Sequence, residues 1–279
     1  MTRSILLEAP GAGEALAMVQ KLKADLPGLQ RIVSETSRFA KLLDLHPQYV
    51  GNLVYLRFAF DTGDASGHNM ATKASARLME SILTRFPAMK EVSVSGNYCT
   101  DKKTSAVNGI LGRGKYLVTE AVIPEKIVRR YLKSSSEQIV ELNIRKNLIG
   151  TMLAGGLRSA NAHAANILLA FYLANGQDAA KIIEGSQAIT HCENRKGDLY
   201  FSLTLPNLIV GSVGNGKGLS FVEENLERLG CREPRPSGQN AARLAAICAA
   251  ATWCGELSLM AALTQPGELM RAHEKWERT

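Results

Sequence analysis

A short strand that ends in a polar turn is the feature that most constrains how this chain can fold. Residues 90–94 (KEVSV) alternate polar and apolar side chains, which predicts a strand, and the glycine and asparagine that follow favour a turn. Asp101, Lys102 and Lys103 then stand side by side. Two ammonium groups beside a carboxylate at a strand end suit the stabilisation of an oxygen atom that becomes negative. Taken alone, the three residues are better explained as a solvated turn.

Length, composition and charge exclude several classes of protein. With 279 residues, 46% of them hydrophobic, the chain can bury a core and form one or two domains. Its 33 Lys and Arg exceed its 26 Asp and Glu, which gives a net charge of +7. The basic residues are spread out without interleaved aromatics, so no nucleic-acid partner is expected. Cofactors that carry phosphate explain the basic excess more simply.

The cysteines and the apolar runs predict a soluble protein of the cytoplasm. The five cysteines form no C-x-x-C pair and no metal-ligand spacing, so no metal site is expected. An odd number of cysteines without a signal peptide indicates reduced thiols. The longest apolar stretches, 166–174 and 245–254, are expected to fall well short of a membrane span. No membrane partner is predicted.

Residues 5–93 are expected to form a small unit in which two helices pack on an antiparallel sheet. The spacing of apolar residues predicts helices over 14–26, 30–43 and 71–85. The run LVYLRFAF at 53–60 predicts one strand, and residues 92–94 close the unit as another.

The chain changes character from Ser95 onward. Strands are predicted over 116–123, 187–191, 199–205 and 208–213. Helices are predicted after Pro124, over 134–147 with Ser135 or Ser136 as the cap, and over the Gly- and Ala-rich stretch 150–175. Two more helices are expected at 241–263 and 268–277.

Residues 95–103, SGNYCTDKK, resemble the signature loop of the 3-hydroxy-3-methylglutaryl-coenzyme A (HMG-CoA) reductase family. The resemblance implies that Lys102 stabilises the oxyanion while a thioester is reduced in two hydride steps, first to a hemithioacetal and then, after CoA leaves, from aldehyde to alcohol. Asp178, in Gly-Gln-Asp-Ala-Ala, would ordinarily be a helix cap, but in the family this aspartate lies under the catalytic lysine, where each group perturbs the other's proton affinity.

His273 would ordinarily be a solvated terminal histidine. It occupies the place of the family's mobile-tail histidine, which protonates the departing CoA thiolate.

A second motif, Asp-Ala-Ser-Gly-His-Asn at 64–69, stands between a predicted strand and a predicted helix. By itself it is an ordinary turn, although Gly67 allows close backbone approach and helix-start amides attract phosphate. It resembles the family's nicotinamide-cofactor motif, which usually has methionines where this chain has Ser66 and His68. Arg38 suits the extra ribose phosphate of NADPH. The cofactor-binding residues implied by the resemblance are Ser37, Arg38, Asp64, Ser66, Gly67, His68, Asn69, Val213, Gly214 and Gly216.

The resemblance also implies a set of substrate contacts, each of which would otherwise be an exposed charge or a helix-packing amide. Lys133 matches a contact to the CoA phosphate, and the others would hold the HMG portion. The substrate-binding residues are Arg3, Ser95, Asp101, Lys103, Lys133, Lys146 and Asn166.

The family resemblance predicts an α/β (α+β) protein. A small ferredoxin-like cofactor domain (5–93) would accompany a large, helix-rich catalytic domain (94–279), with residues 1–4 belonging to the large one. The implied activity is the NADPH-dependent reduction of HMG-CoA to mevalonate and CoA, which serves isoprenoid precursor synthesis. Family members build the site between subunits, so a homodimer or a larger assembly is expected.

Two family segments have no match in this sequence: the T-E-G-x-x-x-x-S stretch that carries a catalytic glutamate, and E-N-V-I-G. The chain is therefore expected to lack the N-terminal part of the family's catalytic region. The alternative hypothesis is a truncated non-catalytic homologue, or one subunit of a split reductase whose partner chain carries the missing segment. A basic nucleic-acid binder would show steep salt-dependent DNA binding and is disfavoured.

Overall fold

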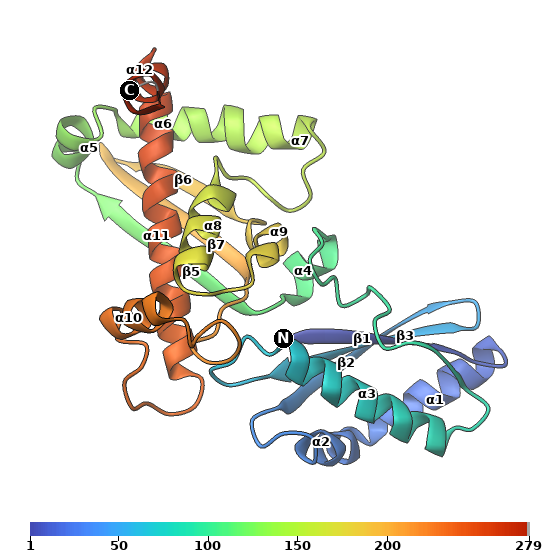
Figure 1. Cartoon of the computed structure of the whole chain (residues 1–279). Helices are drawn as coiled ribbons and strands as arrows, with labels where there is room; N and C mark the ends of the chain where they lie inside the picture. The colour runs from blue at the N-terminus through green and yellow to red at the C-terminus, as the bar shows by residue number, and fades with distance from the viewer. Residues whose placement is uncertain (278–279) are drawn as a thin grey trace.

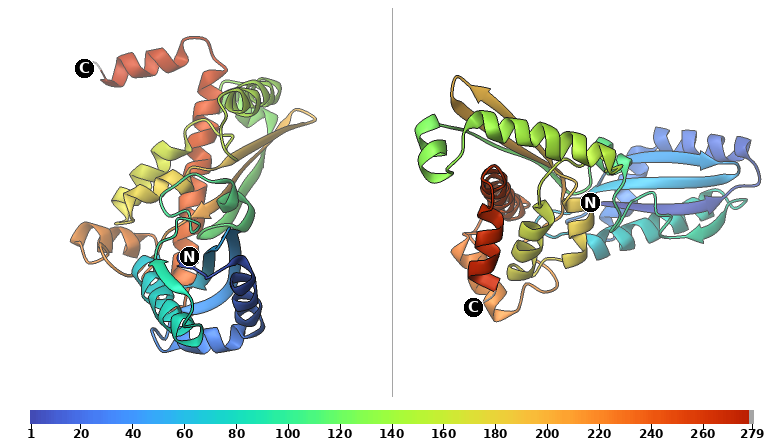
Figure 2. Two further views of the ribbon diagram at one scale, coloured as in Figure 1. Left: turned by 90° about the vertical axis from the view of Figure 1, so that its right-hand side faces the viewer. Right: turned by 90° about the horizontal axis from the view of Figure 1, so that it is seen from above.

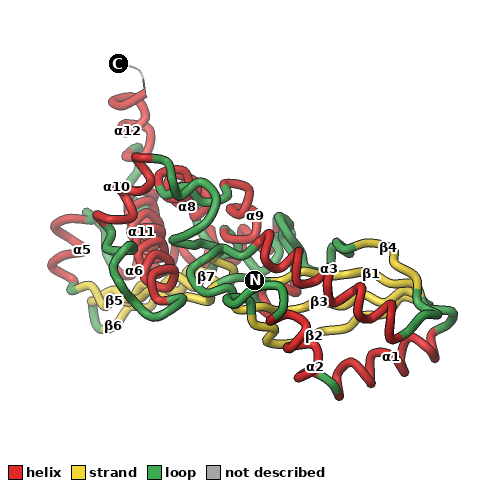
Figure 3. Tube along the Cα trace, turned by 60° about the horizontal axis from the view of Figure 1, so that its bottom comes forward, coloured by secondary structure: helices red, strands yellow, loops and turns green. Residues whose placement is uncertain are grey.

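Two antiparallel sheets organise the chain, and the computed structural model describes residues 1–277 (Figure 1). The first sheet has the strand order β2-β3-β1-β4 and the second the order β5-β7-β6. Figure 3 shows the two sheets as separate groups of yellow strands with helices around them. The fold is therefore α+β, which confirms the predicted class at that level. The strands are β1 (Thr2–Glu8), β2 (Lys41–Val50), β3 (Leu53–Asp61), β4 (Lys90–Ser93), β5 (Lys115–Ile123), β6 (Ile189–Arg195) and β7 (Asp198–Leu208).

Three helices cover one face of the small sheet: α1 (Ala12–Ala24), α2 (Leu26–Ser34) and α3 (His68–Arg85) (Figure 1). The strand β3 shows why, since Val54, Leu56, Phe58 and Phe60 point to one face and are buried in the same core. The three helical patterns predicted within residues 5–93 each correspond to one of these helices, and all three pack on the sheet, not two as the expected architecture had it.

The predicted helix 30–43 is wrong in its second half. The helix α2 ends at Ser34, and β2 begins at Lys41 as an edge strand of the sheet. Leu42 and Leu45 are three residues apart, which fits the spacing of a helix. The apolar periodicity therefore did not reveal that this segment is a strand. Pro47 lies within the strand, where an edge position tolerates the missing N–H.

The second sheet is covered on one face by the long helix α11 (Gln239–Leu263), together with α6 and α8. Buried side chains from β7 and α11 share a core, for example Leu203 and Leu205 with Leu244 and Cys248. The remaining helices of this part are α4 (Ala106–Leu111), α5 (Glu125–Tyr131), α6 (Ser136–Leu142), the π-helix η1 (Asn143–Gly150), α7 (Thr151–Leu153), α8 (Ala164–Ala174), the 3₁₀-helix η2 (Ala179–Lys181), α9 (Ile182–Gly185), α10 (Ser220–Arg228) and α12 (Glu268–Glu277).

Local signals in this part were informative, and the apolar run at 241–263 forms the predicted helix, but two other predicted elements are wrong. The predicted Ser135 cap is confirmed, with a complete capping box to Gln138. The single helix predicted over 150–175 is wrong, because the chain leaves the helix after Leu153 and begins α8 only at Ala164. The strand predicted over 208–213 is also wrong. There β7 ends at Leu208 and the following residues form a turn.

The helix α11 corrects the expectation that the apolar stretches fall well short of a membrane span. This 25-residue helix contains an 18-residue window with a mean hydropathy of 1.5, so within residues 1–277 it passes a length-and-composition test for a span. Half of that window is buried inside the protein, as in the core helix of a globular domain. It packs against β5, β7 and α8.

Residues 2–4, predicted to belong to the large domain, pair with β3: Thr2 lies opposite Ala59 and Ser4 opposite Arg57. The side chain of Thr2 nevertheless faces the large part, where it contacts the carbonyl of Cys99 at 3.1 Å. This segment therefore links the two parts.

Glu256, in the middle of α11, fixes the start of α8. The carboxylate is fully buried. It accepts hydrogen bonds from the backbone N–H groups of Ala162 (2.7 Å) and His163 (2.6 Å) and from Oγ1 of Thr190 (3.2 Å). These bonds satisfy amides that would otherwise be orphaned at a buried helix start.

We expect Glu256→Gln to lower the free energy of unfolding by about 2–3 kcal/mol, because an amide N–H₂ group would face buried donors. Urea denaturation measures the change. The matched control is Glu224→Gln on α10, an exposed partner of Arg228, which should cost less than about 0.5 kcal/mol. Equal losses in the two variants would contradict the role given to Glu256.

Candidate functional site

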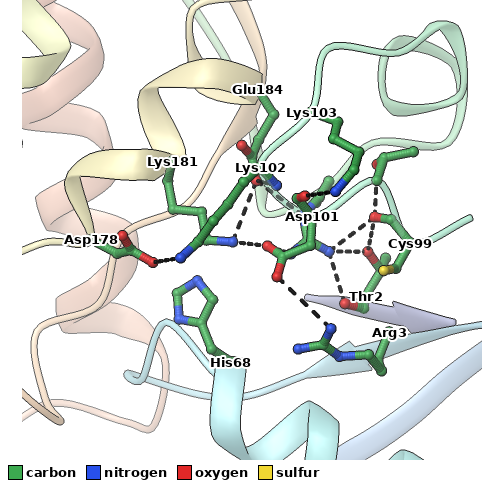
Figure 4. Close-up of polar contacts among 12 residues, drawn as sticks. Thr2, Arg3, His68, Cys99, Asp101, Lys102, Lys103, Asp178, Lys181 and Glu184 are labelled. Carbon is green, nitrogen blue, oxygen red and sulfur yellow. Dashed lines mark hydrogen bonds and ion pairs between the residues drawn. The ribbon is translucent and has the colours of Figure 1, made fainter. Parts of the chain in front are cut away.

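Asp101 is the centre of a cluster of charged side chains at the junction of the two parts (Figure 4). Its Oδ1 atom accepts a hydrogen bond from Nη2 of Arg113 at 2.7 Å and another from the ammonium of Lys181. Nη1 of Arg3 lies 3.9 Å from its Oδ2 atom. Three cations therefore converge on one carboxylate and balance its charge.

Glu184 is the second carboxylate of this cluster and is completely buried. Its Oε1 atom lies 3.2 Å from Nε of Arg113 and 3.6 Å from Nζ of Lys181. Lys181 is also completely buried, and burial lowers the pKa of its ammonium and that of the Arg113 guanidinium. Buried charges of this kind are stable only when paired. The two carboxylates and the two cations thus depend on one another.

Lys102 stands beside this cluster with its ammonium directed away from it. Its backbone has a φ of 56°, in the left-handed region that few non-glycine residues adopt. Its N–H donates to Oε1 of Glu184 at 3.2 Å, which holds that turn in place. Its ammonium lies 3.2 Å from Oδ2 of Asp178, and both side chains are partly exposed. A ligand can therefore reach this ion pair.

Asp178 combines the two roles that the sequence left open. Its Oδ1 atom accepts a hydrogen bond from the N–H of Ala180 at 3.2 Å, so it caps η2. Its other oxygen faces Lys102. The helix-cap interpretation and the proximity to the lysine both hold.

Three of the predicted substrate contacts gather around Asp101. Nη1 of Arg3 donates to Oγ of Ser95 at 3.2 Å, and the ammonium of Lys103 donates to the carbonyl of Asp101 at 3.0 Å. The second Nη atom of Arg3 donates to Oγ1 of Thr72 on α3 at 2.7 Å. Arg3 therefore connects the Asp101 loop to the first turns of α3.

The two turns predicted to bind the cofactor lie against each other. Ala65 and Val213 form an isolated parallel bridge, and the carbonyl of Asp64 accepts from the N–H of Val213. Gly211 makes this approach possible, because a Cβ there would lie 2.3 Å from the backbone nitrogen of Ser66. The turns thus form one continuous surface.

Exposed backbone completes this surface. Gly214 and Gly216 are exposed, and nothing lies near the position of a Cβ on Gly214. Gly67 is the N-cap of α3 with a φ of 87°, and a Cβ there would collide with the side chain of Thr62. The free amides at the start of an 18-residue helix favour an anion, so the arrangement fits a phosphate-bearing cofactor.

The side chain of Asp64 has a structural task in addition. Its two carboxylate oxygens accept from the N–H groups of Gly238 and Ala241, each at 2.8 Å. Asp64 thereby caps the N-terminus of α11. The turn from the small part is fastened in this way to the longest helix of the large part.

His68, the first residue of α3, points toward the Lys102–Asp178 pair in Figure 4. Its Nε2 atom is buried without a hydrogen-bond partner. Burial, assisted by the charge of Lys181, lowers the pKa of its imidazole to about 4.

Ser37 and Arg38 lie in the turn between α2 and β2, not on a helix as expected. That turn leads to Lys41, which pairs with Asp61 at the end of β3. The predicted phosphate contact therefore stands at the same end of the small sheet as the Asp64 turn. Arg38 is exposed, and its guanidinium lies 4.7 Å from the centre of the Phe39 ring.

The other predicted contacts are not brought to Lys102 within one chain. The helix α12, which carries His273, follows the end of α11 that lies away from the Asp64 turn (Figures 1 and 2). Lys133 lies between α5 and α6, beside Gln265. Lys146 is in η1, where its ammonium contacts Oδ1 of Asn147 at 3.5 Å, and Asn166 is exposed on the first turn of α8.

Arg113, Lys181 and Glu184 were missed by the sequence analysis. Lys181 and Glu184 follow the Gly-Gln-Asp motif with the spacing of a helical ion pair, which was the available signal. Their burial could not be read from a local pattern, because it depends on a loop about eighty positions earlier. Within the described residues, no group of three His, Cys, Asp or Glu side chains could hold a metal ion.

Known proteins show which family shares these features. Residues 1–278 match the family model described as hydroxymethylglutaryl-coenzyme A reductase. Over 280 residues the chain is 47% identical to the 3-hydroxy-3-methylglutaryl-coenzyme A reductase of Phycomyces blakesleeanus, covering 98% of this chain and 24% of that protein. It is 46% identical over 277 residues to the Pyrococcus abyssi reductase, covering 98% and 67%. The chain thus spans between a quarter and two thirds of these relatives.

Solved structures share the fold. The 3-hydroxy-3-methylglutaryl-coenzyme A reductase of Streptococcus pneumoniae has a TM-score of 0.65 at 16% identity, covering 95% of this chain and 71% of that one. A structure of the class II reductase from the same organism bound to NADPH has a TM-score of 0.67 at 16% identity, covering 99% and 66%.

We expect Glu184→Gln to destabilise the fold by about 3 kcal/mol, because Lys181 and Arg113 would lose a buried counter-charge. In the double variant with Lys181→Met the loss should be smaller than the sum of the two single losses. Urea denaturation measures all three. Glu125→Gln, which removes an exposed partner of Arg129, is the control. Additive losses would refute the coupling of Lys181 and Glu184.

Proposed function

Because this chain belongs to the hydroxymethylglutaryl-coenzyme A reductase family, we propose that it catalyses the NADPH-dependent reduction of HMG-CoA to mevalonate and CoA. The observation that carries this proposal is the 3.2 Å contact between Lys102 and Asp178 beside the two joined turns. The motif at 95–103, the Lys102–Asp178 ion pair and the two joined turns all support the same location for the active site.

Lys102 is the electrophilic group of the proposed reaction. Its ammonium meets the acyl oxygen and stabilises the negative charge that develops there. Asp178 holds that ammonium in position, and Glu184 holds the backbone that carries it. Bound NADPH would supply the hydride equivalents, two for each thioester reduced to an alcohol.

Arg3, Ser95 and Asp101 would grip the HMG portion. The guanidinium of Arg3 suits a carboxylate, and it already contacts Ser95. Within residues 1–277, the contact of Oδ2 of Asp101 is the 3.9 Å approach of Arg3, so this oxygen retains lone pairs for a substrate hydroxyl.

The joined turns would hold NADPH. The start of α3 and the exposed Gly214 and Gly216 offer backbone to the pyrophosphate. Arg38 would contact the extra ribose phosphate. The S. pneumoniae reductase solved with NADPH supports this choice of cofactor.

We propose that residues 5–93 form the cofactor domain and residues 94–279 the catalytic portion, with 1–4 linking them. The strand order β2-β3-β1-β4, with helices between β1 and β2 and between β3 and β4, supports a ferredoxin-like description of the small domain. The free cysteines support a cytoplasmic location.

We also propose that the working form contains at least two copies. The helix α12, which carries His273, follows the end of α11 that lies away from the Asp64 turn (Figure 1). A second copy, or a movement of α12, is required if His273 and Lys102 act on the same ligand. Exposed apolar side chains on β5, namely Tyr116, Val118 and Val122, support association.

The test is to follow NADPH oxidation with HMG-CoA, and NADPH formation from NADP⁺ with mevalonate and CoA. Turnover by the chain is expected, and Lys102→Met should lower kcat by about 10²–10³ because one donor to the oxyanion is removed. Lys126→Met on α5, an exposed lysine, should leave kcat unchanged. Absence of turnover in both directions would refute the enzyme proposal for this chain.

Arg38 should decide the cofactor preference. We expect Arg38→Gln to raise the KM for NADPH at least about tenfold, by loss of a charge-assisted contact, and to leave the KM for NADH unchanged. Steady-state kinetics with both cofactors measure the difference. Arg31→Gln, an exposed arginine on α2, is the control. An equal effect on both cofactors would exclude recognition of the extra phosphate.

A further inference from the structure

The imidazole of His68 is a polar group at the reaction centre. Within residues 1–277, its buried Nε2 atom has no hydrogen-bond partner. The ring lies on the small-domain side of the Lys102–Asp178 pair and points toward it (Figure 4). The cofactor motif that residues 64–69 resemble usually has methionine at this position.

The surrounding structure fixes the position of His68. Gly67, in a left-handed conformation, starts α3 at this residue. The carbonyl of His68 accepts a hydrogen bond from Oγ1 of Thr72 at 2.9 Å, and Thr72 in turn accepts one from Arg3 at 2.7 Å. The first turn of α3 is thereby connected to the substrate-gripping arginine. These contacts hold the backbone from which the imidazole projects.

The charges around His68 keep its ring neutral. Lys102 faces it from the loop after β4, Lys181 and Asp178 from η2, and Arg113 from the loop before β5. Three of these four groups are cations, and the ring stands at the positive end of a helix. Burial, assisted by the charges of the three cations, lowers the pKa of the imidazole to about 4, although the charge of Asp178 acts in the opposite direction. A neutral imidazole still donates one N–H hydrogen bond near pH 7.

We propose that His68 is a further catalytic residue, whose N–H donates a second hydrogen bond to the acyl oxygen that Lys102 binds. The inference rests on the proposed reductase function. Hydride adds to the carbonyl carbon, the C=O π pair moves onto oxygen, and NADPH becomes NADP⁺. The oxyanion is then shared by the Lys102 ammonium and the His68 N–H, and no proton needs to leave the imidazole.

The test compares His68→Met, the residue usual in the family, with His68→Gln, whose side-chain amide retains an N–H donor. Loss of one oxyanion donor should lower kcat by about 10² in His68→Met, and His68→Gln should recover most of that loss. The dissociation constant for NADPH, from fluorescence titration, should change less than about threefold in both. His191→Met, an exposed histidine of β6, is the matched control.

The proposal would be overturned if the kcat of His68→Met equalled that of the wild type, or if the variant lost affinity for NADPH and kept its kcat. His68 would then have a packing role. A second measurement does not require turnover. In ¹⁵N-histidine-labelled chain, HMG-CoA should shift the imidazole nitrogen resonances of His68 and leave those of His191 unchanged. If the wild-type chain lacks turnover, the proposed function fails, and unchanged His68 resonances would then refute the hydrogen bond independently.

Discussion

The site depends on the ion pairs that the partly buried Asp101 and the buried Glu184 make with the buried Arg113 and Lys181. These residues come from the loop after β4, the approach to β5 and the η2–α9 segment, which are far apart in the sequence. A buried ion is tolerated only with its counter-charge in place, so the cluster forces these segments together. The reactive pair of Lys102 and Asp178 sits on the two segments that the cluster joins. Its 3.2 Å separation is a consequence of the surrounding ion pairs.

A second constraint joins the cofactor surface to the rest of the molecule. The Asp64 turn belongs to the small sheet, but its carboxylate caps α11 and its carbonyl binds the 212–213 turn. One aspartate thus positions the surface proposed to bind the cofactor relative to the core of the large part. A change in the relative position of the two parts would break these hydrogen bonds. The parts are therefore connected here by specific contacts and not by a flexible linker alone.

The sequence could specify the motifs but not all of the elements between them. Lys102, Asp178 and Arg3 were found because their motifs are local, and the Ser135 cap because its chemistry acts within four residues. Leu42 and Leu45, three residues apart, fit a helical period, and both face the core from β2 because the strand register shifts between Leu42 and Asp44, which only the pairing with β3 shows. Lys181 and Glu184 would be solvated helix charges in isolation. Their burial in the ion-pair cluster depends on contacts with residues about eighty positions away, and no local sequence pattern indicates those contacts.

In the proposed reaction, the geometry of α11 would limit how the thiolate of CoA is protonated. The leaving sulfur and the oxygen bound by Lys102 are attached to the same carbon, so a histidine serving the sulfur must come within a few ångströms of that site. The 25 residues of α11 separate its ends by roughly 37 Å, and α12 follows the end away from Asp64 (Figures 1 and 2). His273 of the same chain can act on that sulfur only after a large displacement of α12. A second copy that presents its α12 to this site needs no such displacement, and this is the physical argument for association.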